Sequence, residues 1–141
     1  MPSRVQFREM QPTDLADACR LWSASEGVEL AEGDSIEELT RYLARNPGMS
    51  YVATAGTHIV GAILGGHDGR RGFLYHLAVE PSHRGQRVGR ELVNRSVEAL
   101  KREGVRRVLI LVARHNPEGR QFWIREGWET LDFAEPMGLN L

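Results

Sequence analysis

The stretch VEPSHRGQRVGRELVNRSVEAL, residues 79–100, constrains the fold more than any other part of the chain. It runs from the end of a strand into an amphipathic helix, in which Val93, Val97 and Leu100 recur at helical spacing. The apolar run RRVLILVA that follows, residues 106–113, is typical of a strand buried on both faces. The sequence therefore predicts a strand–helix–strand crossover, in which the two strands are parallel.

Shorter elements surround this crossover. Strands are predicted at 5–10, in two runs within 50–66 around a turn near Gly56, and at 72–81. Helices are predicted at 12–24 with Thr13 as N-cap, at 36–45 with a capping box from Ser35 to Glu38, and from Asn116 and Pro117 to Gly127. Residues 128–133 and 135–141 are expected to close the sheet as a hairpin. The fold class is thus α/β, with a mixed and mostly antiparallel sheet in a single domain, 1–141.

Composition narrows the classes of partner. The 141 residues suit one domain, and 41% hydrophobic and 26% charged residues are ordinary for a globular protein. A net charge of −1 gives no general reason to expect nucleic acid or membrane as partner. The single cysteine, Cys19, rules out an internal disulfide and fits a reducing cytoplasm, and the N-terminus lacks the apolar core of a signal peptide. We expect a cytoplasmic protein.

The start of the predicted helix favours phosphate binding. A helix N-terminus has unpaired N–H groups and a partial positive charge, and glycine lets a ligand approach the backbone closely. Gly85 and Gly89 lie on either side of this helix start, and Arg84, Arg87 and Arg90 add guanidinium donors. The residues alone therefore indicate a phosphate or diphosphate ligand.

Neither a Gly-Lys-Ser/Thr phosphate loop nor a Gly-x-Gly-x-x-Gly dinucleotide loop is present. Instead, HRGQRVGREL resembles the Arg/Gln-x-x-Gly-x-Gly/Ala coenzyme A loop of the GNAT superfamily of N-acetyltransferases. Arg84 matches the first position and Gly89 the last, while Arg87 stands where the family usually has its middle glycine. With an ordinary helical backbone, the amide of Arg87 would still face a diphosphate.

A second segment carries the same resemblance. NPEGRQFWIREGW is similar to the family's Asn-x-x-Ala-x-x-Phe-Tyr-x-x-x-Gly-Phe segment through Asn116, Phe122, Gly127 and Trp128. The predicted order of strands and helices is also the family's order over nearly the whole chain. GGHDGRRGFLYHLAV, residues 65–79, resembles a group of small uncharacterised bacterial members.

The resemblance implies a site for acetyl-CoA between two splayed parallel strands, with helices on both faces of the sheet. The pantetheine arm would pair with the backbone of the first splayed strand, and one nearby N–H would polarise the thioester carbonyl. The residues implied to bind the cofactor are Leu77, Ala78, Val79, Arg84, Gly85, Gln86, Arg87, Val88, Gly89, Arg90, Asn116, Phe122 and Trp123. The implied reaction is direct attack of a primary amine, from a small molecule or peptide, on acetyl-CoA.

Besides Arg87, two further features depart from the family pattern. Trp123 stands where the family often has a tyrosine as general acid, and an indole N–H is no proton source near neutral pH. A thiolate is already a fair leaving group, and Tyr75 is another candidate donor. The run 106–113 lacks the glutamate that members acetylating protein N-termini often carry, which makes that substrate class less favoured.

The general base stays open among five residues: His76, Glu80, Asp68, Glu26 and Glu29. Histidine as a residue type suits the role of a base near neutral pH, but a histidine within a strand is as often a packed core residue. Non-catalytic interpretations also exist for two of the others: Glu80 can be a solvated residue at the strand end, and Asp68 can simply form a turn. No metal site is expected, because the histidines lie in separate segments.

Two other functions and the oligomeric state also stay open. Because of Trp123 and the missing glutamate, the chain can instead be a coenzyme A-binding regulatory module that has lost catalysis. A nucleotide-binding domain that uses the same loop is the third hypothesis. The exposed terminal hairpin would allow pairing with a second copy, so a homodimer is kept open. The sequence does not identify the amine.

Overall fold

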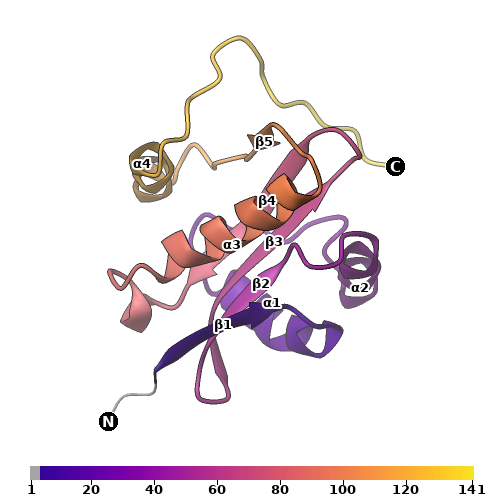
Figure 1. Ribbon diagram of the computed structural model, residues 1–141. Helices are drawn as coiled ribbons and strands as arrows, with labels where there is room; N and C mark the ends of the chain where they lie inside the picture. The colour runs from indigo at the N-terminus through magenta and orange to yellow at the C-terminus, as the bar shows by residue number, and fades with distance from the viewer. Residues whose placement is uncertain (1–3) are drawn as a thin grey trace.

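The computed structural model describes residues 4–141, and its centre is a five-stranded sheet in the order β1-β2-β3-β4-β5 (Figure 1). The strands are β1 Val5–Glu9, β2 Tyr51–Ala55, β3 His58–His67, β4 Gly72–Val79 and β5 Val108–Leu109. Neighbouring strands are antiparallel except β4 and β5, which are parallel. The predicted mixed sheet and its parallel crossover are confirmed.

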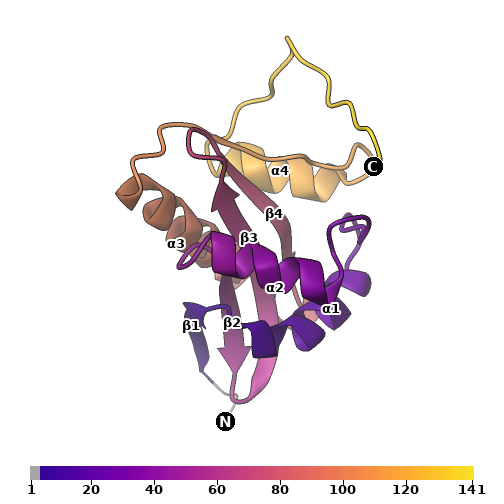
Figure 2. The same ribbon diagram turned by 90° about the vertical axis from the view of Figure 1, so that its right-hand side faces the viewer.

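Helices cover both faces of this sheet, as predicted (Figure 2). They are α1 Leu15–Ser23, α2 Ile36–Arg45, α3 Val88–Arg102 and α4 Pro117–Arg125, with short 3-10 turns η1 Pro12–Asp14 and η2 Pro81–His83. One apolar cluster joins α1 and α2 to the sheet and contains Leu15, Trp22 and Leu39. A second cluster joins α3 to the sheet and contains Leu92 and Leu100, so the core has two layers.

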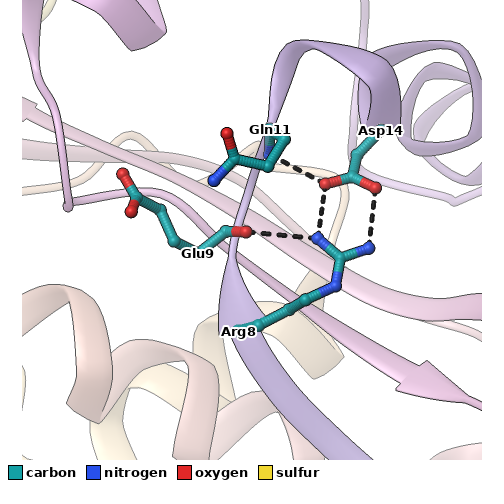
Figure 3. Close-up of polar contacts among 4 residues, drawn as sticks. All are labelled: Arg8, Glu9, Gln11 and Asp14. Atoms are coloured by element: carbon teal, nitrogen blue, oxygen red, sulfur yellow. Dashed lines mark hydrogen bonds and ion pairs between the residues drawn. The ribbon is translucent and has the colours of Figure 1, made fainter.

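The first helix begins later than the sequence predicted. Pro12 opens the turn η1, and α1 starts at Leu15, so Thr13 is not its N-cap. The Asp14 carboxylate holds the turn instead, accepting the Gln11 N–H at 2.8 Å and two guanidinium N–H groups of Arg8 at 2.7 and 2.8 Å (Figure 3). Hydrogen bonding to Arg8 lowers the pKa of Asp14, although burial acts in the opposite direction. This ion pair ties β1 to the start of α1.

The other predicted helix boundaries are confirmed by their caps. The Ser35 hydroxyl accepts the Glu38 N–H at 3.1 Å at the start of α2. The Asn116 side-chain oxygen accepts the Gly119 N–H at 3.1 Å at the start of α4. Gly104 and Gly127, with φ of 82° and 93°, follow the ends of α3 and α4 in left-handed conformation. These boundaries depend on neighbouring residues only, which explains why the sequence predicts them.

The end of the chain differs from the prediction. Of the run 106–113, only Val108–Leu109 forms a strand, and it is half-buried, while Leu111 is 68% exposed. Within residues 4–141 no strand follows β5, so the predicted hairpin of 128–133 and 135–141 is wrong. Phe133 and Met137 are 82% and 94% exposed there. Since β5 leaves β4 after two paired residues, it offers only a short edge for further strands.

Candidate active site

The backbone of β4 bulges at His76. The register shifts between Ala62 and Leu64 of β3, so that two residues of β4 lie opposite one residue of β3. His76 has a φ of 55°, the left-handed region that a non-glycine residue rarely adopts. Because of the bulge, Tyr75 and His76 both pack toward the α1 side of the sheet, where the His76 ring lies 5.2 Å from the Trp22 ring.

A cavity lies where β4 and β5 separate. The two strands pair only at Gly72 with Val108 and Phe73 with Leu109, and beyond these pairs no ladder joins them. The cavity of about 420 Å³ is lined by 26–29 from the loop after α1, by 74–77 of β4, by 110–113 after β5, and by His115, Asn116 and Trp123. The predicted splay of the parallel pair is confirmed. Tyr75, His76 and Leu77 line this cavity, as do two other candidate bases, Glu26 and Glu29.

His76 has a partner that the sequence analysis missed. Its Nε2 atom lies 2.9 Å from Oδ1 of Asp34, which is 42 residues earlier in the loop between α1 and α2. Both side chains are nearly buried, with 16% and 15% of their surface exposed. The other carboxylate oxygen of Asp34 accepts the Ala31 N–H at 3.0 Å. The sequence held one signal for this contact. Asp34 directly precedes Ser35, whose hydroxyl caps α2, so the Asp34 carboxylate is not needed for the cap and is free for another contact.

Tyr75 is the second titratable group of β4 at this cavity. Burial raises the pKa of its hydroxyl above the ordinary value, so the group keeps its proton around neutral pH. Its ring stacks on Phe73 at 5.9 Å and meets the His76 ring edge-on at 6.4 Å. Tyr75 can therefore donate a hydrogen bond there but does not act as a base.

Two other candidate bases have partners outside the cavity. Glu80 lies after β4, where its carboxylate is 3.1 Å from Nε2 of His58, and it does not line the cavity. Asp68 lies at the turn between β3 and β4 and accepts two backbone N–H groups of that turn at 2.8 Å each. These bonds lower the pKa of Asp68. The structure therefore brings His76, Glu26 and Glu29 together at the cavity and leaves Glu80 and Asp68 apart.

The loop before α3 has the backbone of a glycine-rich turn. Gly85 has a φ of 78° and Arg87 a φ of 64°, and α3 begins at Val88. The condition of an ordinary helical backbone at Arg87 is not met, because the turn into α3 requires the left-handed conformation that glycine adopts without strain. Arg87 is the N-cap residue of α3, but its side chain forms no capping hydrogen bond. The first amides of this helix are thus free to face an anionic ligand.

The side chains around this loop have distinct surroundings. Arg84 donates from Nε to the Val79 carbonyl at 3.1 Å, which fixes the loop to the end of β4. Arg90 lies 3.6 Å from Glu126, after α4. Within residues 4–141, no protein group hydrogen-bonds or pairs with the Arg87 guanidinium. Arg87 thus has all five guanidinium N–H donors available to a ligand, whereas Arg84 and Arg90 each have one contact with the protein.

Gly89 lies in the first turn of α3, close to α4. A Cβ at Gly89 would lie 3.5 Å from the Phe122 ring and 3.6 Å from Val79, so a methyl group fits but a large side chain does not. Val88 is buried and Gln86 exposed, so Val88 can reach a ligand only through its backbone. The missing side chain of Gly89 leaves room for a ligand between α3 and α4.

Asn116 joins α4 to the loop after α1. A Cβ built on Gly27 would lie 2.3 Å from Nδ2 of Asn116, so this glycine allows the close approach. The Trp123 ring packs between Phe122 and Trp128, with ring centroids 5.2 and 5.0 Å apart. The floor of the cavity near α4 is therefore aromatic and tightly packed.

The segment of the chain that contains the cavity and the loop matches one known family. A family model described as Acetyltransferase (GNAT) family matches residues 15–128. The chain belongs to the GNAT acetyltransferase family. It is therefore an N-acetyltransferase by family, and the family uses acyl-CoA, so the resemblance inferred from the two motifs is confirmed.

A curated relative and two solved structures are similar to this chain, and the solved structures share its fold. An uncharacterized N-acetyltransferase of Yersinia pestis is 29% identical over 91% of this GNAT chain and 90% of its own length. The structure of the PaiA N-acetyltransferase of Thermoplasma acidophilum, in complex with coenzyme A, has a TM-score of 0.79 at 19% identity and covers 93% of each chain. An aminoglycoside acetyltransferase from an uncultured soil sample, in complex with sisomicin, has a TM-score of 0.76 at 17% identity over 97% and 96% of the two chains.

Two kinds of feature are absent from residues 4–141. No group of three or more histidine, cysteine, aspartate or glutamate residues is placed to hold a metal ion. No described helix of this GNAT chain is both long enough and apolar enough to cross a membrane.

Proposed function

We propose that the chain transfers the acetyl group of acetyl-CoA to a primary amine of a small molecule or peptide, by direct attack of the amine on the thioester. The observation that carries this proposal is the cavity between β4 and β5, which is lined by His76 and Tyr75 and lies at the splay expected for a pantetheine arm. Leu77 lines the same cavity, and Ala78 and Val79 continue β4 toward the loop.

The cofactor would extend from this cavity to the start of α3. The diphosphate would bind the amides of Gln86 to Arg90 and the guanidinium of Arg87. Arg84 would hold the loop through its Nε bond to the Val79 carbonyl, and its terminal N–H groups would reach a phosphate oxygen. Asn116, Phe122 and Trp123 of the α4 region would bound the pantetheine arm on its other side.

The chemistry requires a free amine, because an ammonium has no lone pair. His76 would accept the proton, since it is the imidazole of β4 that lines the cavity, and the amine nitrogen would then attack the thioester carbon. The new C–N bond forms as the C–S bond breaks, and coenzyme A leaves as a thiolate. Tyr75 would donate a hydrogen bond to that sulfur, because its hydroxyl keeps its proton.

A specific observation favours a second function, a coenzyme A-binding regulatory module that has lost catalysis. Trp123 lines the cavity at the position where family members often have a tyrosine acid. Binding of acetyl-CoA without release of coenzyme A on any amine would favour this module.

Isothermal titration with acetyl-CoA, ATP and NAD tests the cofactor, and amine-dependent release of coenzyme A tests the reaction. The amines are polyamines, amino acids, aminoglycosides and short peptides; aminoglycosides are included because a structural neighbour was solved with sisomicin. Selective acetyl-CoA binding with release on one amine class supports the proposal. No acetyl-CoA binding would contradict it, and preference for ATP would favour a nucleotide-binding domain. A cytoplasmic location and a homodimer stay predictions.

A further inference from the structure

The pair of Asp34 and His76 links the loop before α2 to the bulge of β4 at the edge of the cavity. Asp34 lies in the loop between α1 and α2, whereas His76 lies in β4. The Oδ1 atom of Asp34 is 2.9 Å from Nε2 of His76. With about 15% of each side chain exposed, solvent screens this contact only in part. The pair is therefore well placed to influence proton transfer in the cavity.

The contact decides which ring nitrogen carries the hydrogen. A carboxylate only accepts hydrogen bonds, so Nε2 of His76 must donate to Asp34. In the neutral ring, the lone pair that can accept a proton is then on Nδ1. Within residues 4–141, no protein group forms a hydrogen bond with Nδ1. This leaves Nδ1 available to a substrate amine or to a water molecule that bridges to one.

The backbone and the neighbouring rings hold the imidazole in place. His76 has a φ of 55°, a conformation that is strained for a non-glycine residue and persists only when its surroundings enforce it. The ring of Trp22, which is fully buried, lies 5.2 Å from the imidazole, and the Tyr75 ring meets the imidazole edge-on at 6.4 Å. Backbone strain of this kind is typical of functional sites, where a side chain has to be held in one orientation.

We propose that Asp34 is the positioning residue of His76: it fixes the Nε2–H tautomer and stabilises the imidazolium that forms when Nδ1 takes the proton of the amine. This inference rests on the proposed function. One ammonium proton passes to Nδ1, the amine lone pair forms the C–N bond, and the C–S pair leaves on sulfur. The nitrogen then loses its second proton to the coenzyme A thiolate, which gives the neutral amide and the free thiol. The proton on His76 passes to water, which restores the neutral ring.

Other titratable groups face this pair, and two of them can be set aside. Burial, with the nearby charge of Asp34, raises the pKa of Cys19 on α1, and burial raises that of Tyr75, so both keep their protons. Glu26, Glu29 and His115 also line the cavity and are the rival bases. The test must therefore separate His76 from groups that Asp34 does not contact.

The experiment compares Asp34→Asn with Glu32→Gln, a matched loss of one negative charge at an exposed position of the same loop. Acetyl-CoA affinity is measured by titration, and kcat/KM for the best amine is measured from pH 6 to pH 10. At pH 7 we expect Asp34→Asn to lose about 100-fold in kcat/KM, with unchanged acetyl-CoA affinity, because general base catalysis contributes on this order. Glu32→Gln should match the wild type.

The pH dependence separates a proton-transfer role from a structural one. As the pH rises, more of the amine is already deprotonated in solution, so the loss in Asp34→Asn should shrink. A loss by the same factor at every pH would overturn the role of Asp34 while leaving the proposed function intact. No turnover by the wild type on any amine would overturn the proposed function and the proton-acceptor role of His76 together.

A second measurement does not require activity. Nitrogen-15 NMR of the wild-type imidazoles identifies the tautomer of His76, with His76→Gln used to assign its signals. We expect hydrogen on Nε2 in the wild type, and a shift toward the Nδ1–H tautomer in Asp34→Asn, since an amide can donate to Nε2. An Nδ1–H tautomer in the wild type would overturn the inference, even if Asp34→Asn failed to fold.

Discussion

Replacing Arg87 by glycine should make the protein more stable. Arg87 adopts a φ of 64° directly before α3, where a non-glycine side chain clashes with its own backbone. That clash costs roughly 1–2 kcal/mol, whereas the extra freedom of glycine in the unfolded chain costs roughly 0.5–1 kcal/mol. The net gain for Arg87→Gly is therefore about 0.5–1 kcal/mol, or a rise in Tm of about 2–4 °C for a chain of this size.

Thermal unfolding without cofactor measures this gain, and two neighbouring variants control for it. Gln86→Gly adds the same freedom to the unfolded chain but relieves no strain, because Gln86 does not have a positive φ. It should lower the Tm. Arg87→Ala removes the same charge but keeps the left-handed strain, so its Tm should stay near that of the wild type. If Arg87→Gly melted at the temperature of Gln86→Gly, the strain argument would be refuted.

The same variant should bind acetyl-CoA more weakly. Arg87→Gly keeps the backbone amide but loses the guanidinium that has no protein partner within residues 4–141. A hydrogen bond to a charged group contributes about 1.5–3 kcal/mol, so the affinity should fall by at least about tenfold. Titration of Arg87→Gly and Arg87→Ala should give the same loss. Equal affinity of both variants and the wild type would mean that this side chain does not contact the diphosphate.

Three further predictions concern the loop, the cavity and the fold. Gly89→Trp should abolish acetyl-CoA binding in titration with a circular dichroism spectrum like that of the wild type, since a bulky side chain fills the space between α3 and α4; unchanged affinity in the folded variant would contradict the placement of the diphosphate. Gly27→Ala should lower the Tm more than Gly33→Ala, because both positions have a positive φ but only at Gly27 would the new Cβ collide with Asn116, 2.3 Å away; equal Tm values would argue against that contact. Asp14→Asn should lower the free energy of unfolding at pH 7 by about 1–3 kcal/mol. The folded state lowers the pKa of Asp14, so this contribution is present above the unfolded value of about 4 and is lost as the pH falls through the folded value; a difference that does not shrink in urea titrations as the pH is lowered below about 4 would contradict the ion-pair explanation.

The sequence predicted those parts of the fold that depend on neighbouring residues. The capping box of Ser35 and Glu38 and the cap by Asn116 are each local, and both are present in the structure. The extent of β5 depends instead on how far it follows β4, which an apolar run cannot indicate. The run 106–113 is apolar because 110–113 line the cavity, although only Val108–Leu109 pairs in the sheet.

The sequence indicated the glycine-containing turn before α3, but it indicated the residues that line the cavity only in part. His76 and Tyr75 were candidates because they precede the loop on one strand, and both line the cavity. Asp34 was missed because its contact with His76 spans 42 residues and exists only once α1 and α2 have packed on the sheet. In the sequence, Glu80 and His76 were equally good candidates for the base. The fold distinguishes them, because His76 lines the cavity and Glu80 does not.

The two non-glycine residues with positive φ within residues 4–141 lie at opposite ends of the candidate site. His76 lines the cavity where the amine would react, and Arg87 lies at the turn where the diphosphate would bind. Each costs stability that a glycine at the same position would save, yet a glycine would supply neither an imidazole nor a guanidinium. Position-specific strain of this kind is expected where a side chain has a task. The gain in stability from Arg87→Gly and the loss of acetyl-CoA affinity in the same variant would therefore be two measurements of one compromise.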